Sequence, residues 1–337
     1  MNRRHALREL RRESRELAFG IGRDVEARWY AARSDGERAV LAHAQAIRFS
    51  RGYRESTHAY RQLDALLERF GDFDTGLADT PAAPARFVAF VGYSRSGHSL
   101  VGSLLDAHPD AVIAHEVHAL KHLARGASFE TVIRALQQNA RIFRIMGRHY
   151  TGYDYVVPEQ WQGRTRRLTV VGDKKGNGSA RLLRRDPGAL ERIRARVPVP
   201  LHFVHVVRNP YDNIATKALR TGRRLEDAAA IYFANARAIA ALKARGDVAV
   251  HDLHLDQLIA QPHAELTALL AALGLATDVP GYLDACADVL FGAPNRTRER
   301  VTWPADLVAR IETELAALPF TCGYAGTPPR PATRAAA

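Results

Sequence analysis

The sequence predicts an α/β protein: a three-layer α/β/α domain around a central, mainly parallel sheet, preceded by an N-terminal helical extension. Short apolar runs alternate with segments of helical periodicity between residues 86 and 252. Strands that are apolar throughout are typical of a parallel sheet covered by helices on both faces. The chain has 337 residues, which is enough for one such domain with additions.

The elements follow from the apolar pattern in chain order. Residues 1–80 are predicted to form the helical extension, because Leu7, Leu10 and Leu17 recur at helical spacing and similar residues follow them. This extension either packs on the main domain or acts as an acceptor-binding or dimerising arm. Strands are predicted at 86–92, 111–114, 168–172, 201–207 and 247–252. Helices are predicted at 97–106, 128–147, 178–185, 213–221, 225–245, 262–273 and 304–317. The α/β domain should span 81–326, and the Pro-, Ala- and Arg-rich residues 327–337 should be a disordered tail.

Composition narrows the classes of partner and the location. The formal net charge is +12, which favours an anionic ligand. No helix-turn-helix pattern or aromatic-interleaved basic stretch is present, so a nucleic-acid partner is not expected. The sequence contains no apolar run of about 18 residues that would span a membrane. With only Cys286 and Cys322 and no apolar secretory signal, the chain is predicted to be cytoplasmic.

A glycine- and serine-rich turn follows the first predicted strand. The sequence from Gly92 to Ser99 reads GYSRSGHS and leads directly into an apolar helix. Backbone N–H groups of such a turn, together with the positive end of the helix dipole, bind anions. The spacing matches the P-loop pattern G-x-x-x-x-G-K-S/T, except that His98 occupies the lysine position. We therefore expect a P-loop-like loop that binds a phosphate-bearing molecule other than a simple Mg·ATP.

A second motif follows the fourth predicted strand. Arg208 ends that strand, Pro210 opens a turn, and Thr216 lies about two turns into the next helix. The forked guanidinium of Arg208 can bind a phosphate, and the Thr216 hydroxyl can add a hydrogen bond. The alternative is structural: Arg208 caps the turn and Asp212 serves as an N-cap.

Together the two motifs resemble the sulfotransferase family, whose donor is 3′-phosphoadenosine 5′-phosphosulfate (PAPS). The resemblance covers chiefly residues 86–118, 168–176 and 200–220. The segment GYSRSGHSLVGSLLDAHPD looks most like the tyrosylprotein-type and bacterial branches. The resemblance implies transfer of a sulfuryl group to a hydroxyl acceptor, with 3′,5′-adenosine bisphosphate (PAP) as the product and no metal.

The resemblance also assigns the donor site. The 5′-phosphosulfate is expected to contact the loop residues Ser94, Arg95, Ser96, Gly97, His98 and Ser99. Arg208 and Thr216 are expected to bind the 3′-phosphate, with Thr216 in place of the family's serine. Arg298 lies in the segment 292–300, where the family often completes the nucleotide site, although the usual R-K-G signature is missing. The alternative is that Arg296, Arg298 and Arg300 form a solvated basic face.

The catalytic residues implied by the resemblance come from three loops. Glu116 occupies the position of the general base, and His115 and His118 are the alternatives. Lys174 matches the transition-state lysine, with Lys175 in reserve, and Arg95 would stabilise charge on the departing phosphate. His98 departs from the threonine of many relatives, and it either donates to a phosphate or faces the acceptor.

Other functions remain open at this stage. A degenerate P-loop kinase or NTPase is one, although His98 argues against it. A non-catalytic nucleotide- or nucleic-acid-binding protein is another. His115, His118 and His122 could bind zinc, but no cysteine lies near them. The acceptor could be a small molecule, a glycan, a lipid or a peptide tyrosine, and aromatic residues between 129 and 161 either line its pocket or pack in the core. The oligomeric state is not predicted.

Overall fold

The computed structural model describes residues 83–151 and 155–326, together with residues 23, 26–29, 31–33, 39, 42–43 and 328. Packing divides the chain into two units, 1–76 with 141–154 and 77–140 with 155–337. The described residues of the first unit are almost all helical. Most of the predicted extension at 1–80 and of the predicted tail at 327–337 lies outside the described residues. The predicted site residues all lie in the second unit.

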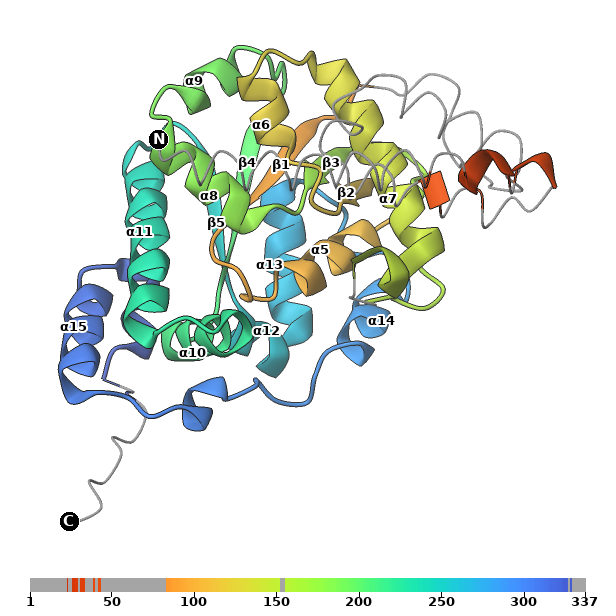
Figure 1. Ribbon diagram of the computed structural model, residues 1–337. Helices are drawn as coiled ribbons and strands as arrows, with labels where there is room; N and C mark the ends of the chain where they lie inside the picture. Colours follow the sequence, from red (N-terminus) through yellow and green to blue (C-terminus); the bar gives the residue numbers. More distant parts are fainter. Residues whose placement is uncertain are drawn as a thin grey trace. The chain divides into compact units, whose positions relative to one another are not determined.

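A parallel five-stranded sheet forms the centre of the second unit, as far as the described residues show (Figure 1). Its strands are β1 (Arg86–Val91), β2 (Ala111–Ala114), β3 (Val170–Asp173), β4 (Leu201–Val207) and β5 (Ala249–His254). Their order across the sheet is β2-β3-β1-β4-β5, and every neighbouring pair is parallel. The prediction of a parallel sheet is therefore confirmed. The limits of β3 and β5 lie about two residues later than the sequence indicated.

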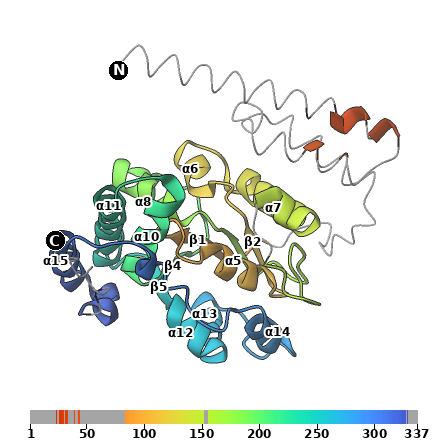
Figure 2. The same cartoon turned by 60° about the horizontal axis from the view of Figure 1, so that its bottom comes forward.

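Helices cover both faces of this sheet. They are α5 (His98–Asp106), α6 (Ala119–Ala124), α7 (Phe129–Thr151), α8 (Gly176–Arg185), α9 (Ala189–Arg194), α10 (Pro210–Thr221), α11 (Leu225–Ala244), α12 (Leu255–Ala260), α13 (Pro262–Leu273), α14 (Tyr282–Asp288) and α15 (Ala305–Ala316), with 3-10 turns at Thr297–Arg300 and Pro319–Tyr324. Figure 2 shows α5, α12, α13 and α14 on one side of the sheet and α6, α8 and α11 on the other. None of the described helices is long and apolar enough to cross a membrane.

Two hydrophobic cores separate the three layers. Phe87, Ala89 and Val91 of β1 belong to the core under α6, α8 and α11, whereas Val88 and Phe90 belong to the core under α5 and α13. Alternate residues of one strand thus face opposite layers, as the pleat of a strand requires. Because both faces of β1 are buried, the strand is apolar throughout, and this is the pattern that predicted it.

The register of the sheet brings four loops to one edge. Asp173, at the end of β3, pairs with Ala89 of β1 and with Ala114 at the end of β2. The loops after β1, β2 and β3 therefore start beside one another. The loop after β4 joins them, because β4 pairs with β1 in parallel. Ligands of open parallel sheets bind at this carboxyl edge.

Candidate functional site

The loop after β1 has the backbone of an anion-binding turn. Arg95 has a φ of 72° and Gly97 a φ of 96°, so both lie in the left-handed region. A side chain at Gly97 would also meet Leu255 at 3.0 Å, which explains the glycine. Because Gly97 has no side chain to cap α5, the first N–H groups of this helix are left for a ligand. The exposed Arg95 side chain lies on the same loop.

Ser96 has its side chain turned into the protein. Its hydroxyl donates to the carbonyl of Tyr93 at 3.2 Å and accepts from Nδ2 of Asn213 at 2.8 Å. The residue is fully buried. Of the predicted donors, Ser96 therefore offers its backbone N–H and not its hydroxyl. Asn213, on α10, anchors the first loop to the second motif, and sequence reasoning missed it.

His98 is buried beneath the loop. A Cβ atom added to Gly92 or Gly176 would lie 2.6 Å and 2.4 Å from its ring, so the imidazole is packed between two glycine backbones. Its Nε2 lies 3.4 Å from the carbonyl oxygen of Val91. Burial, followed by the nearby charge of Lys174, lowers the pKa of His98 to about 3, and the ring is neutral. The ring thus points to the Val91 carbonyl, and the backbone N–H of His98 at the start of α5 remains available for an anion.

Lys174 is the buried cation at the centre of the site. Its side chain is 3% exposed, and its Nζ donates to Ser99 Oγ at 2.9 Å, His115 Nε2 at 3.1 Å and Glu116 Oε1 at 3.2 Å. An ammonium has three N–H donors, and three acceptors meet them. Gly102 on α5 makes room for the side chain, because a Cβ there would lie 2.8 Å from Cγ of Lys174. Burial lowers the pKa of Lys174, and the Glu116 carboxylate opposes that effect.

Glu116 lies between two lysines. Its Oε2 accepts from Lys175 Nζ at 2.5 Å, while its Oε1 accepts from Lys174. The Glu116 side chain is still 48% exposed, so a ligand can reach it. Burial raises the pKa of this carboxyl, but the two ammonium groups outweigh burial and hold the pKa well below its usual range.

The two histidines beside Glu116 differ in their position. His115 Nε2 lies 3.1 Å from Lys174 Nζ, which can only donate, so this ring nitrogen is the acceptor of that hydrogen bond. His118 precedes α6, which begins at Ala119. The helix that would align His115, His118 and His122 for zinc therefore does not extend over all three. Among the described residues, no group of three His, Cys, Asp or Glu side chains is arranged to hold a metal ion.

Arg208 joins the two predicted motifs. Its Nη1 donates to the carbonyl of Arg95 at 3.0 Å and to Thr216 Oγ1 at 3.3 Å. Its Nη2 donates to the carbonyl of Asn295 at 2.9 Å and to Thr297 Oγ1 at 3.3 Å. The guanidinium thus binds three separate segments and does not merely cap its own turn. Thr297, which lies far along the chain, brings a second hydroxyl that sequence reasoning missed.

The N-cap of α10 is not Asp212, the residue that the structural alternative had named. The cap is Asn209, whose side chain accepts from the N–H groups of Tyr211 at 3.0 Å and of Asp212 at 3.3 Å. The Asp212 carboxylate instead binds Arg298, accepting from its backbone N–H at 2.8 Å and from its Nη1 at 2.5 Å. Arg298 is therefore a partly buried, ion-paired residue. Arg296 is 68% exposed and matches the solvated alternative better.

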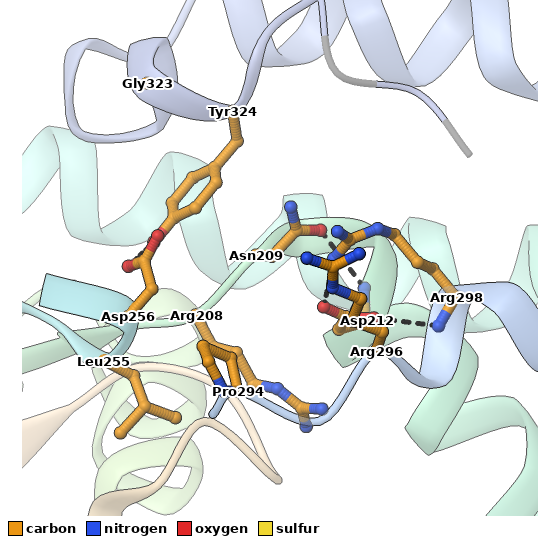
Figure 3. Close-up of a pocket in the computed structure, with 10 residues that line it drawn as sticks. All are labelled: Arg208, Asn209, Asp212, Leu255, Asp256, Pro294, Arg296, Arg298, Gly323 and Tyr324. Carbon is orange, nitrogen blue, oxygen red and sulfur yellow. Dashed lines mark hydrogen bonds and ion pairs between the residues drawn. The ribbon is translucent and has the colours of Figure 1, made fainter. Parts of the chain in front are cut away.

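A pocket of about 280 Å³ lies beside Arg208 (Figure 3). Its lining consists of Arg208, Asn209, Asp212, Leu255, Asp256, Pro294, Arg296, Arg298, Gly323 and Tyr324. Both of its carboxylates have partners, since Asp212 binds Arg298 and Asp256 accepts from the Tyr324 hydroxyl at 2.5 Å. Three arginines and the carboxyl end of β4 therefore surround a cavity that suits an anionic ligand.

The structure describes only some of the aromatic residues that could line an acceptor pocket. Phe129 packs edge-on against Phe87, with 5.6 Å between the ring centroids, and belongs to the core side of α7. Tyr155 packs edge-on against Phe291, with 6.5 Å between the ring centroids, and Phe291 is 58% exposed. The side chains of residues 150 and 153 lie outside the described part of the chain. For Phe129, core packing is therefore the better interpretation.

The chain is similar to several solved sulfotransferase structures. The sulfotransferase domain of the Synechococcus olefin synthase has a TM-score of 0.41 at 19% identity, covering 70% of this chain and 95% of that one. A sulfotransferase from Alicyclobacillus acidocaldarius has a TM-score of 0.37 at 17% identity, covering 70% of this chain and 94% of that one. A sulfotransferase from Mycobacterium avium has a TM-score of 0.39 at 12% identity, covering 87% of this chain and 95% of that one. No curated protein matches the chain.

The sequence profile of the sulfotransferase family matches residues 88–279. This match covers more than half of the chain and includes the β1 loop, Lys174 and the Arg208 motif. It does not single out the tyrosylprotein-type branch, so that part of the resemblance stays a prediction. The chain belongs to the sulfotransferase family.

Proposed function

We propose that this chain transfers a sulfuryl group from PAPS to the hydroxyl group of an acceptor, in the cytoplasm. The observation that carries the proposal is the 3.0 Å hydrogen bond from Arg208 to the carbonyl of Arg95. This contact puts the two anion-binding motifs side by side. A nucleotide with one phosphate on its 3′ oxygen and another on its 5′ oxygen can contact both motifs at once.

The residues present fit such a donor. The N-terminus of α5 and the left-handed turn at Arg95 suit the 5′-phosphosulfate. Arg208, with the hydroxyls of Thr216 and Thr297 within 3.3 Å of its guanidinium, suits the 3′-phosphate. The pocket that Arg298 lines lies next to Arg208 and offers space for the rest of the nucleotide.

The charged groups around Lys174 suit the transfer step. The donor supplies the sulfuryl group, whose bond to the phosphate oxygen breaks as a bond to the acceptor oxygen forms. Lys174 and Arg95 would stabilise the negative charge that grows on the departing phosphate. Glu116, which is 48% exposed and lies 3.2 Å from Lys174, would take the proton of the acceptor hydroxyl.

Glu116 is a weak base while both lysines hold it, because its pKa is held well below the usual range. A shift of Lys174 toward the negative oxygens of a bound donor would remove one of these ammonium groups. The pKa of Glu116 would then rise toward the ordinary range of a glutamate, and its basicity would increase. On this proposal, donor binding prepares the base.

The kinase alternative requires a cation where this chain has His98. That imidazole is buried and has a pKa of about 3, so it brings no positive charge to a triphosphate. A non-catalytic nucleotide-binding protein has no need for a base between two lysines. Both alternatives are therefore less well supported than sulfuryl transfer.

Calorimetric titration tests the proposal. We expect PAP to bind without metal at micromolar concentration and more tightly than Mg·ATP. Arg208→Ala should weaken PAP binding by about a hundredfold, since two or more hydrogen bonds to a charged group are lost. The matched control is Arg237→Ala, which removes an exposed arginine whose partner is Glu314 on α15.

Two results would contradict the proposal. Tighter binding of Mg·ATP than of PAP would favour the kinase alternative. Equal loss of PAP binding in Arg208→Ala and Arg237→Ala would show that the affinity depends on net charge and not on the site.

A further inference from the structure

The loop that carries Glu116 has a strained backbone. Glu116 has a φ of 64° and His118 a φ of 66°, and neither is a glycine. Side chains with a Cβ atom rarely adopt this left-handed conformation, because Cβ comes too close to the backbone. Something in the surrounding structure must therefore hold the loop between β2 and α6 in this shape.

The carboxylate of Asp173 holds it. Asp173 Oδ1 accepts from the N–H of Val117 at 3.0 Å, and Oδ2 accepts from the N–H of Ala119 at 2.8 Å. Val117 lies between the two left-handed residues, and Ala119 is the first residue of α6. The Asp173 side chain is buried, so water does not compete for these bonds.

Asp173 is itself fixed by the sheet. It is the last residue of β3, which lies between β1 and β2, and it pairs with Ala89 and Ala114. Lys174 and Lys175 follow it directly. One strand end therefore supplies both the ammonium groups that contact Glu116 and the anchor of the loop that bears Glu116.

We propose that Asp173 is a positioning residue of the transfer reaction: its carboxylate fixes the strained loop so that Glu116 meets Lys174 and the acceptor hydroxyl. This inference rests on the proposed function of the site. Asp173 contacts neither the pocket lining nor the phosphate-binding loop through any described hydrogen bond, so its removal should spare donor binding.

The protonation of Asp173 should control the loop. Burial raises the pKa of Asp173 to about 6, although its two backbone hydrogen bonds lower it. Lys175 lowers this pKa further and Glu116 raises it. The Asp173 charge in turn acts on Lys174, the next residue in the chain. When pH falls through about 6, one carboxylate oxygen takes a proton and can no longer accept freely from an N–H group. The loop should then loosen.

The matched test compares Asp173→Asn with Asp106→Asn. Asp106 is also a buried carboxylate that accepts from two backbone N–H groups, those of Ile113 at 2.7 Å and Gly163 at 2.9 Å. Burial raises the pKa of Asp106 to about 7. Asp106 holds a different turn, so the same substitution there reports the general cost of losing a buried acceptor.

We expect Asp173→Asn to lower kcat by about a hundredfold and to leave PAP affinity within about threefold. In the wild type kcat should fall as pH drops through 6, and in Asp173→Asn this fall should disappear. Asp106→Asn should keep the fall. Loss of PAP binding in Asp173→Asn, or retention of the wild-type kcat, would overturn the inference.

Backbone hydrogen exchange of the wild type gives a readout that needs neither an acceptor nor a folded variant. The amides of Val117 and Ala119 should exchange faster below pH 6 than the intrinsic pH dependence of exchange predicts. Unchanged protection of these amides across pH 6 would overturn the inference. If the wild type binds no PAP, the proposed function fails, and the exchange result still decides whether Asp173 anchors the loop.

Discussion

The Arg208 guanidinium donates to the backbone carbonyl of Arg95 over 3.0 Å, although the two residues lie 113 positions apart in the sequence. A second bond, from Asn213 Nδ2 to Ser96 Oγ at 2.8 Å, joins the same two loops. The loop after β1 is thus attached to the second motif at two points. The two loops are therefore held side by side, so that the two phosphates of one donor can bind at the same time.

Lys174→Met should abolish most of the activity but leave binding of the donor nucleotide nearly unchanged. Removing a buried cation that stabilises developing charge typically lowers the rate by about a hundredfold or more. Steady-state kinetics should show the loss in kcat, while calorimetry should show PAP affinity changed only severalfold. Lys175→Met is the control, because Lys175 contacts Glu116 but is not buried at the centre of the site. If Lys175→Met lost the greater share of kcat, the catalytic lysine would be Lys175.

Lys175→Gln should raise the pKa of Glu116. The Lys175 ammonium stabilises the ionised carboxylate at 2.5 Å, so its removal makes protonation easier. The folded-state pKa of Glu116 is depressed, so its contribution to stability is present above the unfolded pKa and is lost as pH falls through the folded pKa. The variant should lose that contribution at a higher pH than the wild type.

Carbon-13 NMR of the Glu116 carboxyl measures this shift directly. Lys217→Gln removes the same charge from α10, at a lysine that is not one of the two holding Glu116, and should leave the Glu116 pKa unchanged. An unchanged Glu116 pKa in Lys175→Gln would show that the two side chains do not pair in solution.

Gly176→Ala should be destabilising because of His98. The added Cβ would lie 2.4 Å from the ring, so the imidazole must move, at a cost of about 1–3 kcal/mol in the free energy of unfolding. His98→Ala in the same chain should cancel much of that cost by providing space. Urea denaturation of the wild type, the two single variants and the double variant gives the coupling free energy between positions 98 and 176. Additive losses would mean that His98 does not lie against Gly176.

Strands β1 to β4 were predictable from sequence because they are buried on both faces, which leaves little freedom in residue type. Strand β5, of which only Leu253 is buried, is less apolar, and its limits were predicted two residues too early. The short helices α6, α9, α12 and α14 were not predicted, since six or seven residues contain too little of the helical period to recognise. The predicted start of α10 at 213 was three residues late, because Asn209 had not been recognised as its cap.

The motifs of the proposed site could be recognised in the sequence because they are contiguous, whereas contacts that depend on the fold could not. The β1 loop and the Arg208 to Thr216 spacing are contiguous patterns. Thr297 and Asp173 were missed because their roles depend on which loops the sheet brings together. The orientation of His98 depends on Gly176, 78 positions away by residue number, and no local pattern reports it.

The central claim is that two motifs bind the two phosphates of one nucleotide. Its most direct test is the affinity of the wild type and of Arg208→Ala for PAP and for adenosine 5′-monophosphate. The account predicts that the wild type prefers PAP by about a hundredfold, and that Arg208→Ala binds both ligands equally, at the wild-type affinity for the monophosphate. If Arg208→Ala kept the preference for PAP, or lost both ligands to the same degree, Arg208 would not bind the 3′-phosphate and the claim would be wrong.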